Sequence, residues 1–238
     1  MRYKSAAALA AALILSGCAA QELGSSRLAS SALSASPAPA KMTPRNEAIL
    51  YLGIVDELVK TKRFGAALAF LDSYAVVQND REPRYWLLRG DALLGMGRHD
   101  EAGQAFDRLV GTGLAGEGWN GKGRIAAAQQ LWHAAAAHFG KAVEKEPANS
   151  DFLNNLAFAS LHTGEKTRSL GYLHQARELD PRSDLIRNNL LIALTLEGKL
   201  DRVEAVLAHI ATDAERTQVR ALVKAAVSSG RWNGGRKS

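Results

Sequence analysis

The chain contains one cysteine, Cys18, whose thiolate is its only sulfur nucleophile. The three residues before it are Leu15, Ser16 and Gly17, at the end of an apolar run that follows a head with two cations. A short cationic head, roughly 7–15 apolar residues and small residues before the cut are typical of a secretory signal peptide. Because a bilayer span needs about 20 residues, we predict a cleaved signal at residues 1–17.

The sequence Leu15-Ser16-Gly17-Cys18 resembles the lipobox of bacterial lipoproteins. The resemblance implies thioether lipidation of Cys18, cleavage before it, and acylation of the new N-terminus, for example by palmitate. The alternative is an ordinary secreted protein with a cysteine at this place by chance. If the lipid uses Cys18, no disulfide can form, and stability must come from packing alone.

Two glycine-rich stretches could suggest phosphate binding. Residues 111–116 match G-x-G-x-x-G, but a dinucleotide site needs that motif between a strand and a helix, and no strand is expected here. Residues 116–122 begin like a phosphate loop, yet Gly123 replaces the serine or threonine that would hold Mg²⁺. We therefore predict no bound cofactor, and interpret these glycines as an enlarged loop or hinge between repeats.

The histidines do not form a metal site in the sequence pattern. His133 and His138 are separated by about 140° on a helix, and no carboxylate or cysteine is arranged with them. No G-x-S-x-G or H-E-x-x-H motif is present. We predict that the chain has no catalytic residues, no metal ligands and no small-molecule substrate, and is not an enzyme.

The charge pattern argues against nucleic-acid binding. The formal net charge of +6 falls to +4 when Arg2 and Lys4 leave with the signal, and basic and acidic residues are interspersed. Mild, mixed charge of this kind is typical of a solvated protein surface. We predict no nucleic-acid partner.

Residues 18–46 are rich in serine, alanine and proline and contain few large apolar side chains. Such a segment cannot bury enough apolar surface to offset the entropy of ordering it. We predict that it is a flexible tether between the lipid and the folded part, and that residues 230–238 form a disordered tail.

Between these segments the chain repeats with a period of 33 or 34 residues. Trp86 returns as Trp119, and Asn154-Asn155 returns as Asn188-Asn189. The clearest repeat has small residues at three fixed positions, together with two aromatic residues and a final proline that breaks the helix. In order along the chain these residues are Trp119, Gly123, Ala135, Phe139, Ala142 and Pro147. This pattern resembles the tetratricopeptide repeat (TPR), in which two helices pack through small residues.

The resemblance implies an all-α TPR superhelix at residues 47–229, with no strands. The period places helix-turn-helix units at about 48–82, 83–115, 116–149, 150–183 and 184–217. A last helix, at about 213–228, has apolar residues on one face and is expected to cap the array, because terminal repeats need a polar outer surface.

In stacked repeats, the first helices of the units line one concave face, where partners bind. Asparagine carries both a donor and an acceptor, so a row of asparagines can hold a peptide backbone. The alternative is that repeated asparagines merely record duplication of the repeat or hydrogen-bond to the loops between units. The candidate groove residues are Asn120, Arg124, Asn154, Phe158, Asn188 and Ile192.

The lipobox, the tether and a repeat array that contains Ala176–Pro181 and Arg187–Leu190 resemble the TadD family of Tad/Flp pilus assembly lipoproteins. The resemblance implies a non-enzymatic accessory that helps a secretin localise or assemble. It also implies a lipid anchor on the periplasmic face of the outer membrane, which Ala19 after the lipidated cysteine favours. A type IV pilus pilotin and a periplasmic adaptor for cell-wall hydrolases or synthases remain alternatives.

Overall fold

The structure is a computed structural model, and it describes residues 43–77, 82–230 and 232. The described residues belong to one compact unit, residues 42–238. The predicted signal, Cys18 and the predicted tether up to residue 42 lie outside the described residues.

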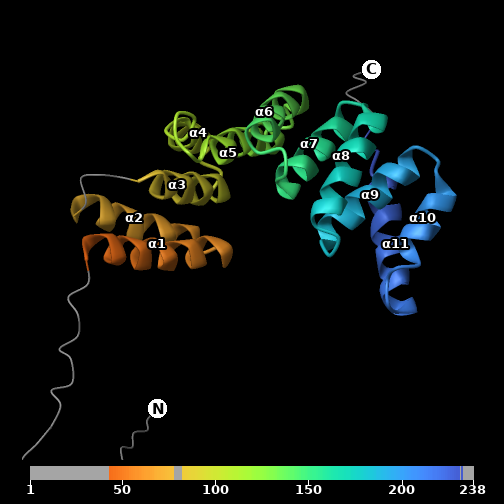
Figure 1. Cartoon of the computed structure of the whole chain (residues 1–238), viewed down its shortest axis with the longest axis horizontal. Coiled ribbons are helices and arrows are strands. Elements are labelled where there is room, and N and C mark those ends of the chain that lie inside the picture. Colours follow the sequence, from red (N-terminus) through yellow and green to blue (C-terminus); the bar gives the residue numbers. More distant parts are fainter. Residues whose placement is uncertain (1–42, 78–81, 231, 233–238) are drawn as a thin grey trace, which may run out of the picture. The chain divides into compact units, whose positions relative to one another are not determined.

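The described residues form helices only, without any strand. Figure 1 shows the helices following one another along the array. No described helix is both long and apolar enough to cross a membrane. The helices are α1 (Pro44–Lys60), α2 (Phe64–Val77), α3 (Pro83–Gly95), α4 (His99–Asp107), α5 (Ala115–Ala128), α6 (Trp132–Lys145), α7 (Ser150–His162), α8 (Lys166–Leu179), α9 (Asp184–Leu196), α10 (Leu200–Leu207) and α11 (Asp213–Ser228).

The helices pair as the repeat pattern predicts. Each helix from α1 to α9 packs against the next one, and α11 packs against α9. The first helices of successive pairs also touch, in the order α1, α3, α5, α7 and α9. The expectation of about five helix-turn-helix units and a capping helix is therefore confirmed.

The predicted tether ran to residue 46, whereas α1 begins at Pro44. The Thr43 hydroxyl accepts a hydrogen bond from the Asn46 backbone N–H (3.3 Å) and so caps the helix. Proline is tolerated in the first helical turn because its missing N–H would have no partner there. The sequence analysis interpreted Pro44 as part of the linker, which was wrong.

Equivalent turns join the two helices of each unit. Gly97, Gly164 and Gly198 have φ of 74°, 84° and 71°, the left-handed conformation expected for glycine after a helix. Lys62 and Gln130 occupy the same place in two other units, each with φ of 59°. The turn geometry is thus kept even where the residue is unfavourable.

Small residues let aromatic rings fill the space between helices. A Cβ atom added at Gly90 would lie 2.5 Å from Phe106, and one added at Gly123 would lie 2.5 Å from Phe139. Since Cβ atoms do not approach so closely, the rings occupy the room that the glycines leave. These contacts join α3 to α4 and α5 to α6, as the repeat pattern predicts.

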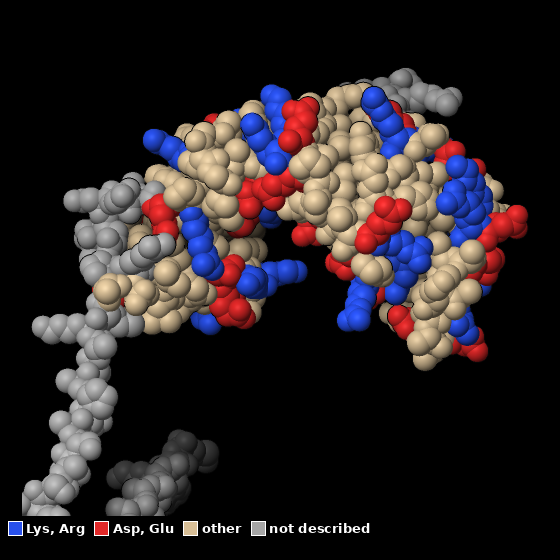
Figure 2. All heavy atoms as spheres, in the orientation of Figure 1, with Lys and Arg blue, Asp and Glu red and all other residues tan. Residues whose placement is uncertain are grey.

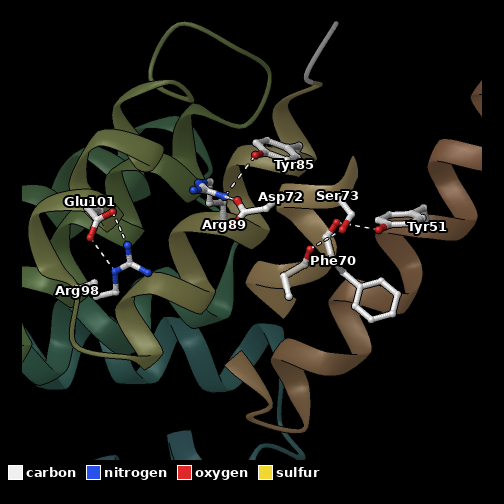
Figure 3. A network of polar contacts seen from close by, with 9 residues as sticks. Tyr51, Phe70, Asp72, Ser73, Tyr85, Arg89, Arg98 and Glu101 are labelled. Atoms are coloured by element: carbon white, nitrogen blue, oxygen red, sulfur yellow. Dashed lines mark hydrogen bonds and ion pairs between the residues drawn. The ribbon is translucent and has the colours of Figure 1, made fainter. Parts of the chain in front are cut away.

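Polar contacts also join the N-terminal helices (Figure 3). The Tyr51 hydroxyl of α1 donates to the Phe70 carbonyl of α2 (2.8 Å), and Arg89 of α3 pairs with Asp72 of α2 (2.6 Å). Arg98 and Glu101 form a two-bonded ion pair where α4 begins. The first two contacts orient neighbouring helices, whereas the Arg98–Glu101 pair is local to the start of α4. The apolar core supplies most of the stability, because exposed ion pairs contribute little.

The chain after α11 departs from the predicted disordered tail at one residue. Trp232 is 4% exposed, and its indole Nε1 donates to the Ala226 carbonyl (2.7 Å). Gly230, with φ of 68°, makes the preceding turn. The prediction was wrong at Trp232 because burial of a large apolar ring outweighs the entropy lost when that residue is ordered.

Candidate protein-binding face

The six predicted groove residues all lie on the first helices α5, α7 and α9. We call the side of these helices, together with α3, that carries them the first-helix face. At one repeat position this face carries Asp91, Arg124, Phe158 and Ile192, separated by 33 or 34 residues. Its chemistry therefore changes from charged to apolar along the array.

The asparagines bond to one another rather than lying free. The Asn155 side-chain amide donates to Asn120 Oδ1 (2.9 Å), and the Asn189 amide donates to Asn154 Oδ1 (2.8 Å). Each bond joins the first helices of adjacent units. Asn154 is only 2% exposed, so it is a packing residue and not an open contact for a partner.

The predicted row of equivalent contacts is thus corrected, because two of its asparagines bond to an asparagine of the adjacent first helix. These bonds also differ from the alternative, which had the asparagines bonded to loops between units. Asn188 ends the row, because the next helix offers no asparagine at the corresponding place. Its Oδ1 is buried and accepts no hydrogen bond within the described part of the chain. Because this oxygen is buried, Asn188 does not offer it as an open contact for a partner.

The charged part of the face is a salt bridge. Arg124 of α5 lies 2.5 Å from the Asp91 carboxylate of α3, and the Arg124 side chain is 42% exposed. Burial raises the pKa of Asp91, and the nearby Arg124 guanidinium opposes that shift. Arg124 is therefore accessible, but an acidic partner would have to share it with Asp91.

The apolar part of the face is an aromatic cluster. Phe158 and His162 of α7 lie against each other, with ring centroids 4.9 Å apart. Trp132, the first residue of α6, stacks on His162 with centroids 3.6 Å apart and ring planes 6° apart. Trp232, which follows α11 in the sequence, lies over His162 with ring centroids 4.5 Å apart. It meets Phe158 edge-on, with ring centroids 5.5 Å apart.

Ile192 contributes less than predicted as an open contact. It is half-buried and packs on the same core cluster as Phe158 and Trp232. The sequence analysis missed Trp132, His162 and Trp232. A signal was present, since a tryptophan two residues after a glycine in an otherwise polar tail is unusual, but the sequence does not reveal which helix it meets.

The glycine motifs that could have suggested phosphate binding belong to helix packing. Gly116, Gly118 and Gly121 lie buried inside α5, where added Cβ atoms would collide with neighbouring helices. The only lysine of this stretch, Lys122, pairs with Asp107 and lies over the Trp119 ring. The structure therefore places these residues in the contacts between α4, α5 and α6.

The two histidines of α6 lie apart from each other. His133 is exposed, whereas the His138 ring stacks on Trp119 with centroids 5.6 Å apart. Burial lowers the pKa of His138, and Lys122 and Lys141 lower it further. Among the described residues, no group of three or more potential ligands could hold a metal ion.

Surface charge is mixed. On the face shown in Figure 2, basic and acidic side chains lie beside one another rather than gathering into a patch of one sign. Many of them are paired, such as Arg220 with Glu204 and Arg168 with Glu165. Recognition at the first-helix face must therefore depend on local geometry more than on net charge.

An array of helix pairs with touching first helices and a chemically graded face defines a repeat scaffold. The tetratricopeptide repeat profile matches residues 52–117 and 120–184, more than half of the chain. The chain therefore belongs to the tetratricopeptide repeat family.

Solved structures of low sequence identity share this fold. The structure titled "Functional Characterization of Pseudomonas Aeruginosa pilF" has a TM-score of 0.61 and 11% identity, and the match covers 79% of this chain and 90% of that one. MamA from Desulfovibrio magneticus RS-1 has a TM-score of 0.51 and 19% identity, with 76% and 97% covered. The comparison with curated proteins finds no match to this sequence.

Proposed function

We propose that the chain is a lipid-anchored, non-enzymatic scaffold that binds a protein partner through its first-helix face. The observation that carries the proposal is the graded face, which holds an accessible salt bridge at Arg124 and an aromatic cluster around Phe158. Such a face suits an extended or helical segment that offers both polar and apolar groups.

The anchor acts by confining the scaffold. A flexible segment of about 27 residues has an average reach of about 30 Å, so the array would remain close to a membrane surface without touching it. Confinement raises the effective concentration of the scaffold near a membrane partner. A weak contact at the first-helix face would then suffice for assembly.

The client that we propose is the Tad/Flp pilus secretion machinery, with the protein helping its secretin to assemble or localise at the outer membrane. The support is the resemblance of the sequence to the TadD family, together with the TPR fold. A type IV pilus pilotin or a cell-wall enzyme adaptor would use the same face for another client.

In-cell cross-linking of the tagged protein, followed by mass spectrometry of the captured envelope proteins, tests this proposal. We expect secretin or other pilus assembly components, and we expect them to be lost with Cys18→Ser because the unanchored protein leaves the membrane. A capture of cell-wall hydrolases or synthases instead would overturn the pilus assignment. Capture that is unchanged by Cys18→Ser would overturn the role of the anchor.

A further inference from the structure

Trp232 is an unusual core residue because it lies outside every helix and repeat. The chain leaves α11, turns at Gly230 with positive φ and returns to place the indole on α7. The indole also donates to the Ala226 carbonyl, one of the last in α11 that lack a helical partner. One side chain thus holds the chain end against the first-helix face.

The surface beneath Trp232 is complete without it. Trp132 stacks on His162, and Phe158 meets both rings edge-on, at 5.9 Å from Trp132 and 4.9 Å from His162. These three residues come from α6 and α7, two tightly packed neighbouring helices. We call them the aromatic patch.

The occupant of the aromatic patch is held differently from the patch itself. Trp232 enters from a short segment whose turn at Gly230 only glycine readily adopts, whereas the patch residues are fixed within helices. Phe158, a patch residue, is among the half-buried side chains that pack with Trp232. The Trp232 side chain therefore covers part of the face on which a partner is proposed to bind.

We propose that the aromatic patch recognises a tryptophan side chain of a partner segment, and that Trp232 is an intramolecular occupant that the partner displaces. The occupant already present shows the chemistry that fits, namely a flat indole that lies tilted over His162, with ring planes 34° apart, and meets Phe158 edge-on. This inference rests on the proposed function and names the feature of the partner that the face selects. A partner must then compete with Trp232 for the aromatic patch, so Trp232 weakens the apparent affinity for the partner.

Competition with Trp232 determines how much weaker the apparent affinity for a partner is than the intrinsic affinity. When the open form is only about a tenth of the population, the apparent Kd is roughly tenfold higher than the intrinsic one. Removing Trp232 should therefore tighten the binding of a tryptophan-bearing segment by roughly tenfold. If Trp232 only stabilised the end of α11, its removal would not increase the affinity for such a segment.

The test uses the full chain and a labelled peptide with the sequence of residues 229–238, whose binding is followed by fluorescence anisotropy. We expect Trp232→Ala to bind this peptide roughly tenfold more tightly than the wild type. The same peptide with alanine in place of its tryptophan should not bind. Adding Phe158→Ala to Trp232→Ala should remove the gain, whereas Trp86→Ala, at the other end of the array, should leave the wild-type affinity.

Two results would overturn the proposal. The first is a Trp232→Ala variant that is folded, as judged by circular dichroism, but binds neither peptide or binds both with equal affinity. Trp232 would then only stabilise the end of α11. The second is a wild-type dimer that requires Trp232, since the occupant would then be a second copy. If Trp232→Ala does not fold, Gly230→Ala, which strains the turn and keeps the indole, must show the tighter binding.

This outcome is separable from that of the proposed function. The peptide measurement concerns the aromatic patch alone, whereas in-cell cross-linking identifies the client. A client without a required tryptophan would defeat the inference and leave the scaffold function standing.

Discussion

At the residue scale, paired asparagines in α7 and α9 stabilise the contact between units. The bond from Asn189 to Asn154 is buried, so Asn189→Ala leaves a buried acceptor without a donor. We predict that it lowers the free energy of unfolding by about 1–3 kcal/mol, measured by urea denaturation.

A matched comparison is the more exposed pair. Asn155→Ala removes the donor to the half-buried Asn120 and should cost less, about 0.5–1.5 kcal/mol. The double variant Asn154→Ala, Asn189→Ala should cost less than the two single variants added together, because no polar group is left unpaired. A strictly additive result would contradict this account.

The imidazole of His138 makes stability depend on pH. Its pKa is lowered in the folded chain, chiefly by burial, so folding favours the neutral form. The corresponding stabilisation is complete above about pH 6.5, the unfolded value, and is lost as pH falls through the folded pKa. We predict that the wild type loses more free energy of unfolding between about pH 7.5 and about pH 5 than His138→Gln does.

His133→Gln, at an exposed position of the same helix, controls for loss of an imidazole and should keep the wild-type dependence. Equal pH dependence in the wild type and His138→Gln would show that the burial of His138 does not affect folding.

The predicted site residues show how far residue types alone can lead. Repeat position assigned Asn120, Arg124 and Phe158 to first helices, and the structure has them in α5 and α7, because the 34-residue period fixes the helix. It could not show that Asn154 is bonded to Asn189, since that contact depends on how two units stack. It also could not show Trp232 over Phe158, a contact between residues distant in sequence.

At the scale of elements, the turns between paired helices depend on backbone conformation. Gly164 has φ of 84°, and no atom would meet an added Cβ there. We predict that Gly164→Ala lowers the free energy of unfolding by about 1–2 kcal/mol, from the cost of left-handed backbone alone.

Gly171 is the matched control because it lies in the middle of α8, also with open space around an added Cβ. Gly171→Ala should raise the free energy of unfolding by about 0.5–1 kcal/mol, since alanine favours a helix. Changes of the same sign in both variants would contradict the assignment of strain to the turn.

Element order was predictable from the sequence because glycine, alanine and aromatic residues recur at fixed offsets. Boundaries were less predictable where one residue type has two uses. Pro44 can belong to a linker or to a first helical turn, and the Thr43 cap decides between them. The prediction for the residues after α11 was wrong for a similar reason. The polar residues that surround Trp232 in the sequence do not indicate that its side chain packs against the core.

At the scale of the whole molecule, the account joins a proposed lipid anchor to a repeat scaffold. The fold and the family are shown by the helices and by the matched repeats. The anchor, the membrane and the client depend on the first residues and on the resemblance to a lipoprotein family. Metabolic labelling with a palmitate analogue should mark the wild type and not Cys18→Ser, and labelling of both would contradict lipidation at Cys18.

The central claim is that a partner binds at the first-helix face, and site-specific photo-cross-linking in cells tests it most directly. A photoreactive side chain at Arg124 is compared with one at Gly171, which lies exposed on the second helix α8. The account predicts a cross-linked envelope protein from position 124 and none from position 171. Cross-links from position 171 alone would contradict it and place recognition on the second helices.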